Sequence, residues 1–251
     1  MDSKQRFSDR VEAYVQYRPG YPDEMLDYVY DAAGFSSNRL IADIGSGTGI
    51  FSRLLLERGS RVYGVEPNEA MREAALEQLG DNPGYTSVNG SAEATGLADA
   101  SVDGIVCAQS FHWFDRRLAK REFQRILRSG GRVALIWNSR RIHGNDFLEQ
   151  YEQLFATFGT DYVAVSHRNI TEHDLRQFFA PRQMKAERFT NGQRLDFTGL
   201  AGRTLSSSYA PAPGHPQHEP MMEELRRLFE RSNVDGEVTF EYETEVYVGN
   251  V

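Results

Sequence analysis

The chain has 251 residues, 40% of them hydrophobic, so it can form one full core with elaborations or a small cap. Its net charge of −8 makes it a poor non-specific partner for nucleic acid, because phosphate neutralisation supplies most of that affinity. The single cysteine, Cys107, excludes an intrachain disulfide and fits a reducing compartment. The charged first ten residues carry no apolar segment, and no apolar run approaches the ~20 residues that span a bilayer. We expect a cytoplasmic protein that binds neither nucleic acid nor membrane.

Residues 1–39 are predicted to form an N-terminal segment that ends in a helix over 23–33. Tyr14 and Tyr17 flank Arg18 in a stretch that Pro19 and the following turn residues interrupt. One interpretation is a docking arm whose tyrosines fill a groove on the core. The preferred interpretation is a lid, in which the tyrosines cover a cationic ligand and Arg18 pairs with a ligand carboxylate.

The stretch L-I-A-D-I-G-S-G-T-G at 40–49 predicts a strand, a glycine-rich turn and the start of a helix. Glycines at every second position allow a tight turn and leave room for a ligand near the N–H groups of the helix start. The dinucleotide pattern requires a small residue at 50, where this chain has Ile50. A carboxylate at the strand end opposes a diphosphate and favours a cation. The candidate binding residues here are Asp43, Gly45, Ser46, Gly47 and Gly49.

Residues 40–49 resemble motif I of the class I S-adenosylmethionine-dependent methyltransferases, whose cofactor carries an ammonium and a sulfonium but no phosphate. The resemblance is specific over 40–138. The Y-x-x-Y-R-P-x-Y-P pattern at 14–22 is similar to the leader of a subgroup that includes trans-aconitate methyltransferase-like proteins. The resemblance implies a single α/β domain over 1–251, with the cofactor-binding core at 40–138. The fold implied is a doubly wound, Rossmann-like, seven-stranded sheet whose last strand is antiparallel, with an N-terminal lid and a C-terminal helical insert.

The next two strand ends supply further candidates for the cofactor S-adenosylmethionine. Glu66 follows a short strand over 61–65, where an acid can take both ribose hydroxyls, and Pro67 comes next. A solvated acid before a helix is the alternative for Glu66. After a strand over 85–89, the family's G-D-A-E reads G-S-A-E, which makes Ser91, Ala92 and Glu93 the candidates for adenine. A serine hydroxyl can accept the adenine amino proton, more weakly than a carboxylate.

A buried strand over 101–108 leads into Q-S-F-H-W-F-D at 109–115, where the resemblance places the sulfonium. Gln109 and Phe111 are assigned to the cofactor and Trp113 to the substrate, because aromatic faces attract a cation. Core packing is the alternative for each aromatic. His112 is the candidate catalytic base, with a packed, hydrogen-bonded histidine as the alternative. Asp115 is expected to cap the next helix.

The C-terminal part, 139–251, is expected to hold the acceptor-side insert and the closing strands. Helices are predicted over 146–158, 171–179 and 221–231, and an antiparallel strand over 238–248. Residues 186–197 fit either a hairpin or one long bent strand. No metal site is expected, because the histidines at 215 and 218 lack a nearby acid or thiol cluster. The candidate substrate-binding residues, besides Trp113, are Asn138, Arg140, Arg203 and Tyr209.

We therefore expect S-adenosylmethionine-dependent methyl transfer to a small-molecule acceptor, with an anionic carboxylic acid as the favoured class. Several arginines in an acidic chain suit such an acceptor, although solvated surface arginines are the plain alternative. Nucleic-acid amino methylation is disfavoured, because the chain has no Pro-Pro pair for the D/N-P-P-Y/F clamp. The alternatives are a non-catalytic S-adenosylmethionine-binding or regulatory protein and, less favoured, a nicotinamide-dependent oxidoreductase.

Overall fold

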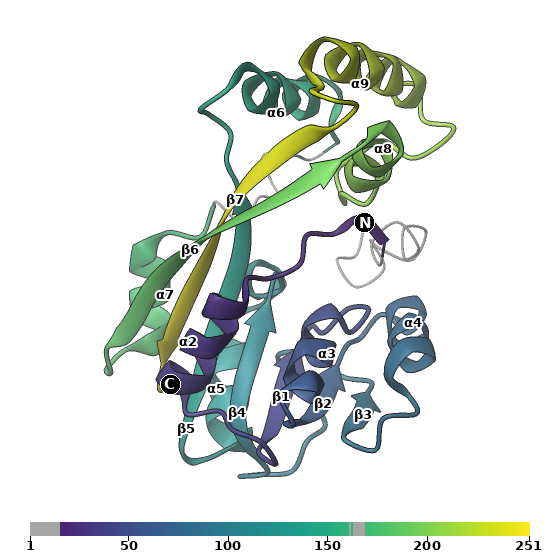
Figure 1. The fold of residues 1–251 in the computed structure, drawn as a ribbon. Helices are drawn as coiled ribbons and strands as arrows, with labels where there is room; N and C mark the ends of the chain where they lie inside the picture. The colour runs from purple at the N-terminus through teal and green to yellow at the C-terminus, as the bar shows by residue number, and fades with distance from the viewer. Residues whose placement is uncertain (1–15, 161, 163–168) are drawn as a thin grey trace.

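A computed structural model describes residues 16–160, 162 and 169–251 and is built around a seven-stranded sheet (Figure 1). The strand order is β3-β2-β1-β4-β5-β7-β6. Neighbouring strands are parallel from β3 to β5, whereas β7 is antiparallel to both β5 and β6. This confirms the predicted doubly wound sheet with an antiparallel last strand. The strands are β1 (Leu40–Ile44), β2 (Arg61–Val65), β3 (Tyr85–Val88), β4 (Val102–Ala108), β5 (Leu127–Arg140), β6 (Met184–Leu195) and β7 (Val238–Gly249).

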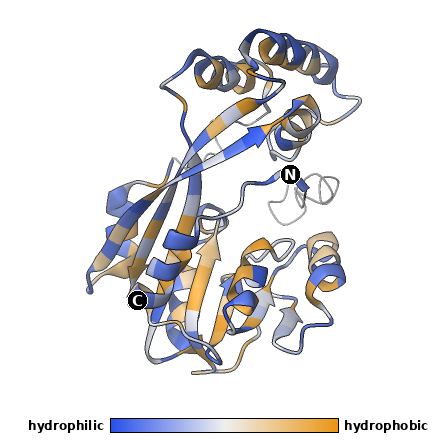
Figure 2. Cartoon of the chain, viewed as in Figure 1, coloured by the Kyte–Doolittle hydropathy of each residue, from blue (hydrophilic) through white to orange (hydrophobic). Residues whose placement is uncertain are grey.

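Helices cover both faces of the sheet. One hydrophobic cluster joins α2 (Asp23–Ala33), α3 (Ile50–Glu57) and α4 (Glu69–Leu79) to one face. The other joins α5 (Arg116–Ile126) and α7 (Glu172–Phe179) to the opposite face. The central strands are accordingly buried on both sides, and Figure 2 shows β4 hydrophobic along most of its length while the edge strand β6 is mostly hydrophilic. Such continuous apolar strands are typical of a parallel sheet between two helical layers.

A cap of three helices lies beyond one end of the sheet and corresponds to the predicted C-terminal insert (Figure 1). It consists of α6 (Asp146–Phe158), α8 (Phe197–Leu205) and α9 (His218–Ser232). These helices share a third hydrophobic cluster with the adjoining ends of β6 and β7, including Leu195, Phe240 and Tyr242. The two long strands therefore join the cap to the sheet.

Two stretches that contain turn-favouring residue pairs lie within strands. Residues 184–195 form one strand rather than a hairpin, because they pair in continuous register with β7, Asn191 opposite Tyr242 and Gly192 opposite Glu241. Residues 128–131, which include the Gly130-Gly131 pair, lie within β5, which begins at Leu127 and has Gly130 at a φ of +84°; the register with β4 shifts here, between Val102 and Gly104. Backbone pairing with β7 thus overrides the turn preference of the Asn191-Gly192 pair.

Residues 16–22, called the strap below, run between the cap and the sheet (Figure 1). The Gly20 carbonyl accepts hydrogen bonds from the side-chain amides of Asn138 and Asn191, at 3.0 and 2.9 Å. The Tyr21 ring meets Phe51 of α3 edge to face, with 5.0 Å between ring centroids. The strap is therefore fixed to the sheet on its C-terminal side. Tyr14, which was assigned to the lid, lies outside the described residues.

Candidate cofactor and acceptor site

A cavity lies at the carboxyl ends of β1, β2 and β4, with the strap and α8 on its other side. This is where open α/β sheets bind ligands. Residues predicted for the site come to it from the glycine turn, the ends of β2, β3 and β4, the strap and α8. Those that line the cavity are Arg18, Asp43, Gly45, Ser46, Gly47, Glu66, Pro67, Ser91, Ala92, Glu93, Gln109, Trp113, Asn138 and Arg203.

The glycine turn is shaped by close contacts as well as by its dihedral angles. Gly45 and Gly49 both have positive φ, +69° and +82°, which disfavours any residue with a side chain. A Cβ at Gly45 would lie 2.6 Å from the Cβ of Ser110, so this glycine lets the segment after β4 approach the turn. A Cβ at Gly49 would lie 2.7 Å from a Leu79 methyl group. Gly49 therefore packs against α4 and does not line the cavity.

Asp43, at the end of β1, is buried with only 1% of its surface exposed. One carboxylate oxygen, Oδ2, accepts a hydrogen bond from the Ser52 hydroxyl at 2.7 Å. The other, Oδ1, has no hydrogen-bond partner among the described residues. Burial raises the pKa of Asp43 to about 7, and the nearby charge of Glu66 adds to the rise. A buried carboxylate with an unsatisfied oxygen is stabilised by a cationic ligand.

Glu66 presents its carboxylate to the same cavity from the end of β2. Oε2 accepts the backbone N–H of Gly47 at 3.0 Å, and Oε1 accepts that of Asn68 at 2.9 Å. Burial raises the pKa of Glu66, opposed by these two hydrogen bonds. Because each carboxylate oxygen can accept a second bond, the group can receive two hydroxyls of a vicinal diol. The same bonds hold the glycine turn against the end of β2.

The loop after β3 brings Ser91, Ala92 and Glu93 to the cavity. Ser91 and Ala94 exchange backbone hydrogen bonds of 3.1 Å and close the loop on itself. Glu93 Oε1 accepts the backbone N–H of Asp115, the N-cap of α5, at 2.9 Å. One oxygen of Glu93 therefore ties the loop to α5. Asp115 caps the helix as predicted, accepting from the N–H groups of Arg117 and Leu118.

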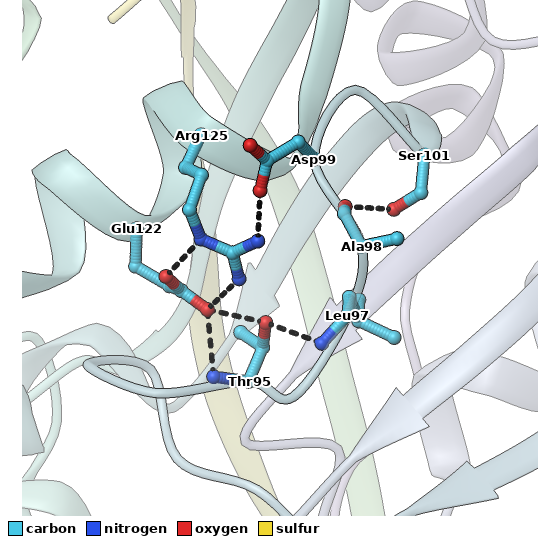
Figure 3. Close-up of polar contacts among 7 residues, drawn as sticks. All are labelled: Thr95, Leu97, Ala98, Asp99, Ser101, Glu122 and Arg125. Carbon is cyan, nitrogen blue, oxygen red and sulfur yellow. Dashed lines mark hydrogen bonds and ion pairs between the residues drawn. The ribbon is translucent and has the colours of Figure 1, made fainter.

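A polar cluster that the sequence analysis missed holds the next part of this loop (Figure 3). Glu122 Oε1 accepts from the backbone N–H and the hydroxyl of Thr95, at 2.8 and 2.6 Å. Arg125 bonds both oxygens of Glu122 and pairs with Asp99 at 2.6 Å. Loop residues 95–99 are thereby fastened to α5. The only sequence signal was an acid and an arginine three residues apart on a helix, which is common on any solvated helix face.

The segment after β4 differs from the predictions at two residues, Phe111 and His112. Gln109 and Trp113 line the cavity. Phe111 is fully buried and packs against Phe178 at 4.6 Å between ring centroids, so it belongs to the core. The side chain of His112 does not line the cavity, and its Nδ1 accepts a 3.4 Å hydrogen bond from the Trp137 indole. Both residues lie in the short 3-10 helix η3 (Phe111–Trp113), whose turn points neighbouring side chains in different directions.

Two of the predicted substrate residues hold the cap together instead of lining the cavity. Arg140 is buried, pairs with Glu152 of α6 at 2.5 Å and lies over the Tyr151 ring, 4.8 Å from its centroid. This contact joins β5 to the cap. Tyr209 packs edge to face on Phe155 with 4.7 Å between centroids, inside the cap. Buried arginines can serve as structural ion pairs, and sequence alone does not separate these from ligand contacts.

Arg203 lines the cavity from α8 and is only 7% exposed. Its Nε donates to the Tyr242 hydroxyl at 3.2 Å, and one terminal nitrogen donates to the Ser207 hydroxyl at 3.1 Å. None of the carboxylates in the described part of the chain forms an ion pair with it. Burying a guanidinium without an anion is costly, so this end of the cavity favours an anionic ligand.

The strap reaches the cavity through Arg18, Pro19 and Tyr21. A terminal nitrogen of Arg18 donates to the Ser206 carbonyl, just beyond α8, at 2.8 Å. Tyr17 does not line the cavity. Its ring lies against Gly202 of α8, where an added Cβ would be 2.1 Å from two ring carbons. Tyr17 thus docks onto the cap, while Arg18 faces the ligand space.

Within the part of the chain that is described, no three histidine, cysteine, aspartate or glutamate side chains gather as metal ligands would. The described helices also include none that is long and apolar enough to cross a membrane.

Residues 42–135 match a protein family described as "Methyltransferase domain". An uncharacterized methyltransferase of Mycobacterium tuberculosis is 39% identical over 139 residues, which are 55% of this chain and 54% of the relative. An uncharacterized methyltransferase-like protein of Schizosaccharomyces pombe is 33% identical over 135 residues, 53% of this chain and 52% of the relative. The chain thus aligns with about half the length of these curated relatives.

Solved structures extend the likeness to nearly the whole chain. A protein described as a type II methyltransferase of Anaeromyxobacter dehalogenans has a TM-score of 0.70 at 24% identity, covering 93% of this chain and 98% of that one. A methyltransferase from an antibiotic biosynthesis pathway of Anabaena variabilis has a TM-score of 0.65 at 22% identity, with the same coverage. At these identities the likeness concerns the fold.

Three observations point the same way: the sheet topology, the glycine turn with the buried acids Asp43 and Glu66, and the family match over residues 42–135. A cation with no phosphate suits Asp43, and a vicinal diol suits Glu66. Residues 42–135 therefore match the methyltransferase domain family in sequence, in sheet topology and in the chemistry of the cavity.

Proposed function

We propose that this protein transfers the methyl group of S-adenosylmethionine to a small-molecule acceptor in the cytoplasm. The observation that carries the proposal is Asp43 Oδ1, a buried carboxylate oxygen without a partner among the described residues, at the glycine turn beside Glu66. When bound, the cofactor supplies a methyl carbon activated by the sulfonium, so that the acceptor–carbon bond forms as the carbon–sulfur electron pair leaves on sulfur. The protein then has to hold the acceptor in line and exclude water.

The lining residues suggest how the cofactor is held. Asp43 faces its cationic part, and Glu66 accepts the two ribose hydroxyls. Ser91, Ala92 and Glu93 surround the adenine, and Pro67 lies beside it on the β2 side. Arg18 pairs with the carboxylate of the methionine part, because a guanidinium matches a carboxylate with two parallel bonds. Gln109 and Trp113 lie at the methyl group.

The acceptor in this proposal is an anionic carboxylic acid. Acids lie at the cofactor end of the cavity, and Arg203 lies on the cap side without a paired carboxylate among the described residues. A carboxylate is already a nucleophile at neutral pH and needs no base, and an arginine that stays protonated could not act as one. The product is then a methyl ester. The similarity of 14–22 to the leader of trans-aconitate methyltransferase-like proteins also supports this class of acceptor.

Calorimetry with S-adenosylmethionine, S-adenosylhomocysteine, NAD and NADP tests the cofactor. Heat with the adenosyl compounds alone supports the proposal, and heat with a nicotinamide dinucleotide alone overturns it. A screen of carboxylic acids, phenols and amines with labelled cofactor then tests the acceptor. Binding of cofactor with no transfer to any of these would favour a regulatory S-adenosylmethionine-binding protein.

Two variants separate the roles of Arg203 and His112 in that screen. We expect Arg203→Ala to raise the KM for a carboxylic acid, while His112→Ala keeps most of the activity, because His112 bonds Trp137 and does not line the cavity. Transfer confined to neutral phenols or amines, with strong loss in His112→Ala, would overturn the carboxylate acceptor and make His112 the base.

A further inference from the structure

The strap is hydrogen-bonded to Arg203 through two side chains that do not line the cavity. We infer that Gln193 and Tyr242 are positioning residues, which hold the Arg203 guanidinium in one orientation when the strap is closed over the cofactor. This inference rests on the proposed function, because it takes the cavity beneath the strap to be the cofactor site. If this holds, binding of the cofactor at one end of the cavity orients Arg203 for an anion at the other end.

The connection consists of three hydrogen bonds in sequence. The Gln193 side-chain nitrogen on β6 donates to the Tyr17 carbonyl of the strap at 3.0 Å. The Gln193 oxygen accepts from the Tyr242 hydroxyl of β7 at 3.4 Å. That hydroxyl in turn accepts from Arg203 Nε at 3.2 Å. Tyr242 is almost completely buried, so water cannot readily replace the missing partner if one bond opens.

The strap also contacts the helix that carries Arg203. The ring of Tyr17 lies on Gly202, the residue before Arg203, where only a hydrogen atom fits. Arg18 donates to the Ser206 carbonyl at 2.8 Å, and the Ser206 hydroxyl donates to the Arg203 carbonyl at 2.7 Å. Movement of the strap away from α8 would therefore break contacts with both the side chain and the backbone of this turn.

The cofactor half of the cavity meets the other side of the same strap. Arg18, Pro19 and Tyr21 line the cavity together with Asp43 and Glu66. A ligand that contacts these strap residues favours the closed arrangement, in which Tyr17 is placed to receive the Gln193 bond. Coupling between two sites is reciprocal and typically changes an affinity by about 5- to 150-fold.

The orientation of Arg203 can be followed by ¹⁵N nuclear magnetic resonance of the arginine Nε–H groups in the full chain. The Arg203 signal is identified by its loss in Arg203→Lys. We expect S-adenosylhomocysteine to slow the exchange of this proton with water by about tenfold or more in the wild-type protein. In Gln193→Ala and Tyr242→Phe the slowing should fall to less than about twofold, because the hydrogen-bond sequence is interrupted.

Gly202→Ala provides an independent variant. Its added methyl group displaces the Tyr17 ring, whereas alanine at a helical position favours the helix, so loss of folding is not expected. The slowing should be lost here too. Gln153→Ala is the matched control, since Gln153 is an exposed cap residue whose amide donates to the nearby Thr157 hydroxyl.

The outcomes separate this inference from the proposed function. Calorimetry on each sample measures S-adenosylhomocysteine binding. An absence of binding to the wild-type protein would overturn both. Binding that leaves the Arg203 proton unchanged, or that slows it equally in Gln193→Ala and Gly202→Ala, would overturn the positioning role alone. Slowing in the wild type and in Gln153→Ala, but not in the three interrupting variants, supports it.

Discussion

At the scale of single residues, Asp43 combines burial with an unsatisfied oxygen, and this predicts a pH-dependent affinity. Its pKa in the ligand-free protein is raised to about 7, first by burial and then by the charge of Glu66, against the Ser52 hydrogen bond. A cation favours the ionised form, so binding below pH 7 must release a proton. The ionised fraction, and with it the affinity for S-adenosylhomocysteine, should fall about tenfold between about pH 8 and about pH 6.

Calorimetry at several pH values, in buffers of different ionisation enthalpy, measures both the affinity and the proton released. Asp43→Asn should bind more weakly and show a much shallower pH dependence, with a remainder from Glu66, whose pKa is also raised. The raised pKa of Asp43 also affects the stability of the ligand-free protein. Because the folded ligand-free protein holds this proton more tightly than the unfolded chain, Asp43 lowers stability as pH rises from about 4 to about 7. A wild-type affinity that does not change with pH would contradict this account.

Glu66→Ala should weaken the binding of S-adenosylhomocysteine about ten- to a hundredfold. The substitution removes a charged acceptor, and such hydrogen bonds contribute roughly 1.5–3 kcal/mol. It also frees the N–H groups of Gly47 and Asn68, which loosens the turn. Glu73→Ala, at an exposed position of the following helix, is the matched control and should bind normally. Normal binding by a folded Glu66→Ala protein would mean that the ribose lies elsewhere.

Whether a residue could be assigned to the cavity from the sequence depended on what determines the direction of its side chain. Asp43 and Glu66 stand at the ends of parallel strands, and the strand ends of one sheet edge meet at a cavity wherever the sheet is doubly wound. Phe111 and Arg140 had the right residue type for a ligand contact but point into the core and the cap. Their direction is set by a 3-10 turn and by partners on distant helices, which periodicity does not report.

At the scale of elements, the loop after β3 depends on α5 for its position. Its Thr95 bonds the Glu122 carboxylate through both its backbone N–H and its hydroxyl, and Arg125 and Asp99 complete the cluster (Figure 3). These contacts hold the pKa of Glu122 near 2: burial opposes the shift, and the bonds from Arg125 and Thr95 outweigh it. The folded pKa is below the usual value, so this contribution to stability is present above about pH 4.5 and is lost as pH falls towards 2.

Glu122→Ala should therefore lower the free energy of unfolding by about 1–3 kcal/mol at neutral pH, because it removes the acceptor of Thr95 and leaves Arg125 with Asp99 alone. We also expect a loss of cofactor affinity of several fold, since Ser91, Ala92 and Glu93 lie in the same loop. Chemical denaturation and calorimetry measure the two effects. Glu57→Ala, an exposed acid in an i,i+4 pair on α3, should change stability by less than about 0.5 kcal/mol. Equal stabilities for the two variants would show that the cluster contributes nothing.

Most elements were predictable from periodicity and their end signals, because local and tertiary preferences agree. The helix bounds Asp23–Ala33 and Asp146–Phe158 match the predicted ranges, and Thr171 caps α7 with a capping box. Prediction was ambiguous at 186–197, where the Asn-Gly pair favours a hairpin locally. Pairing with β7, which lies more than forty residues further along the chain, favours the single strand, because the whole length of β7 pairs with residues 184–195 in continuous register.

At the scale of the whole molecule, the strap links the sheet to the cap, and this arrangement favours a lid over a plain docking arm. Its contacts to Asn138 and Phe51 lie on the sheet, while those of Tyr17 and Arg18 lie on α8. A docking arm would keep these contacts whatever the cavity holds. A lid gains contacts with the cofactor through Arg18, Pro19 and Tyr21, and its opening then costs more.

Hydrogen exchange measured by mass spectrometry distinguishes the two. We expect S-adenosylhomocysteine to slow the exchange of backbone amides in residues 16–22 at least about fivefold, because each opening would then also have to break the ligand contacts. Peptides from α9, which contributes no residue to the cavity lining, serve as the internal reference and should not change. Asn191→Ala, which removes one of the two side chains bonded to the Gly20 carbonyl, should speed exchange in the ligand-free strap and enlarge the effect of the ligand. Saturating ligand that leaves the strap exchange unchanged would identify it as a docking arm, with the cavity entered from another side.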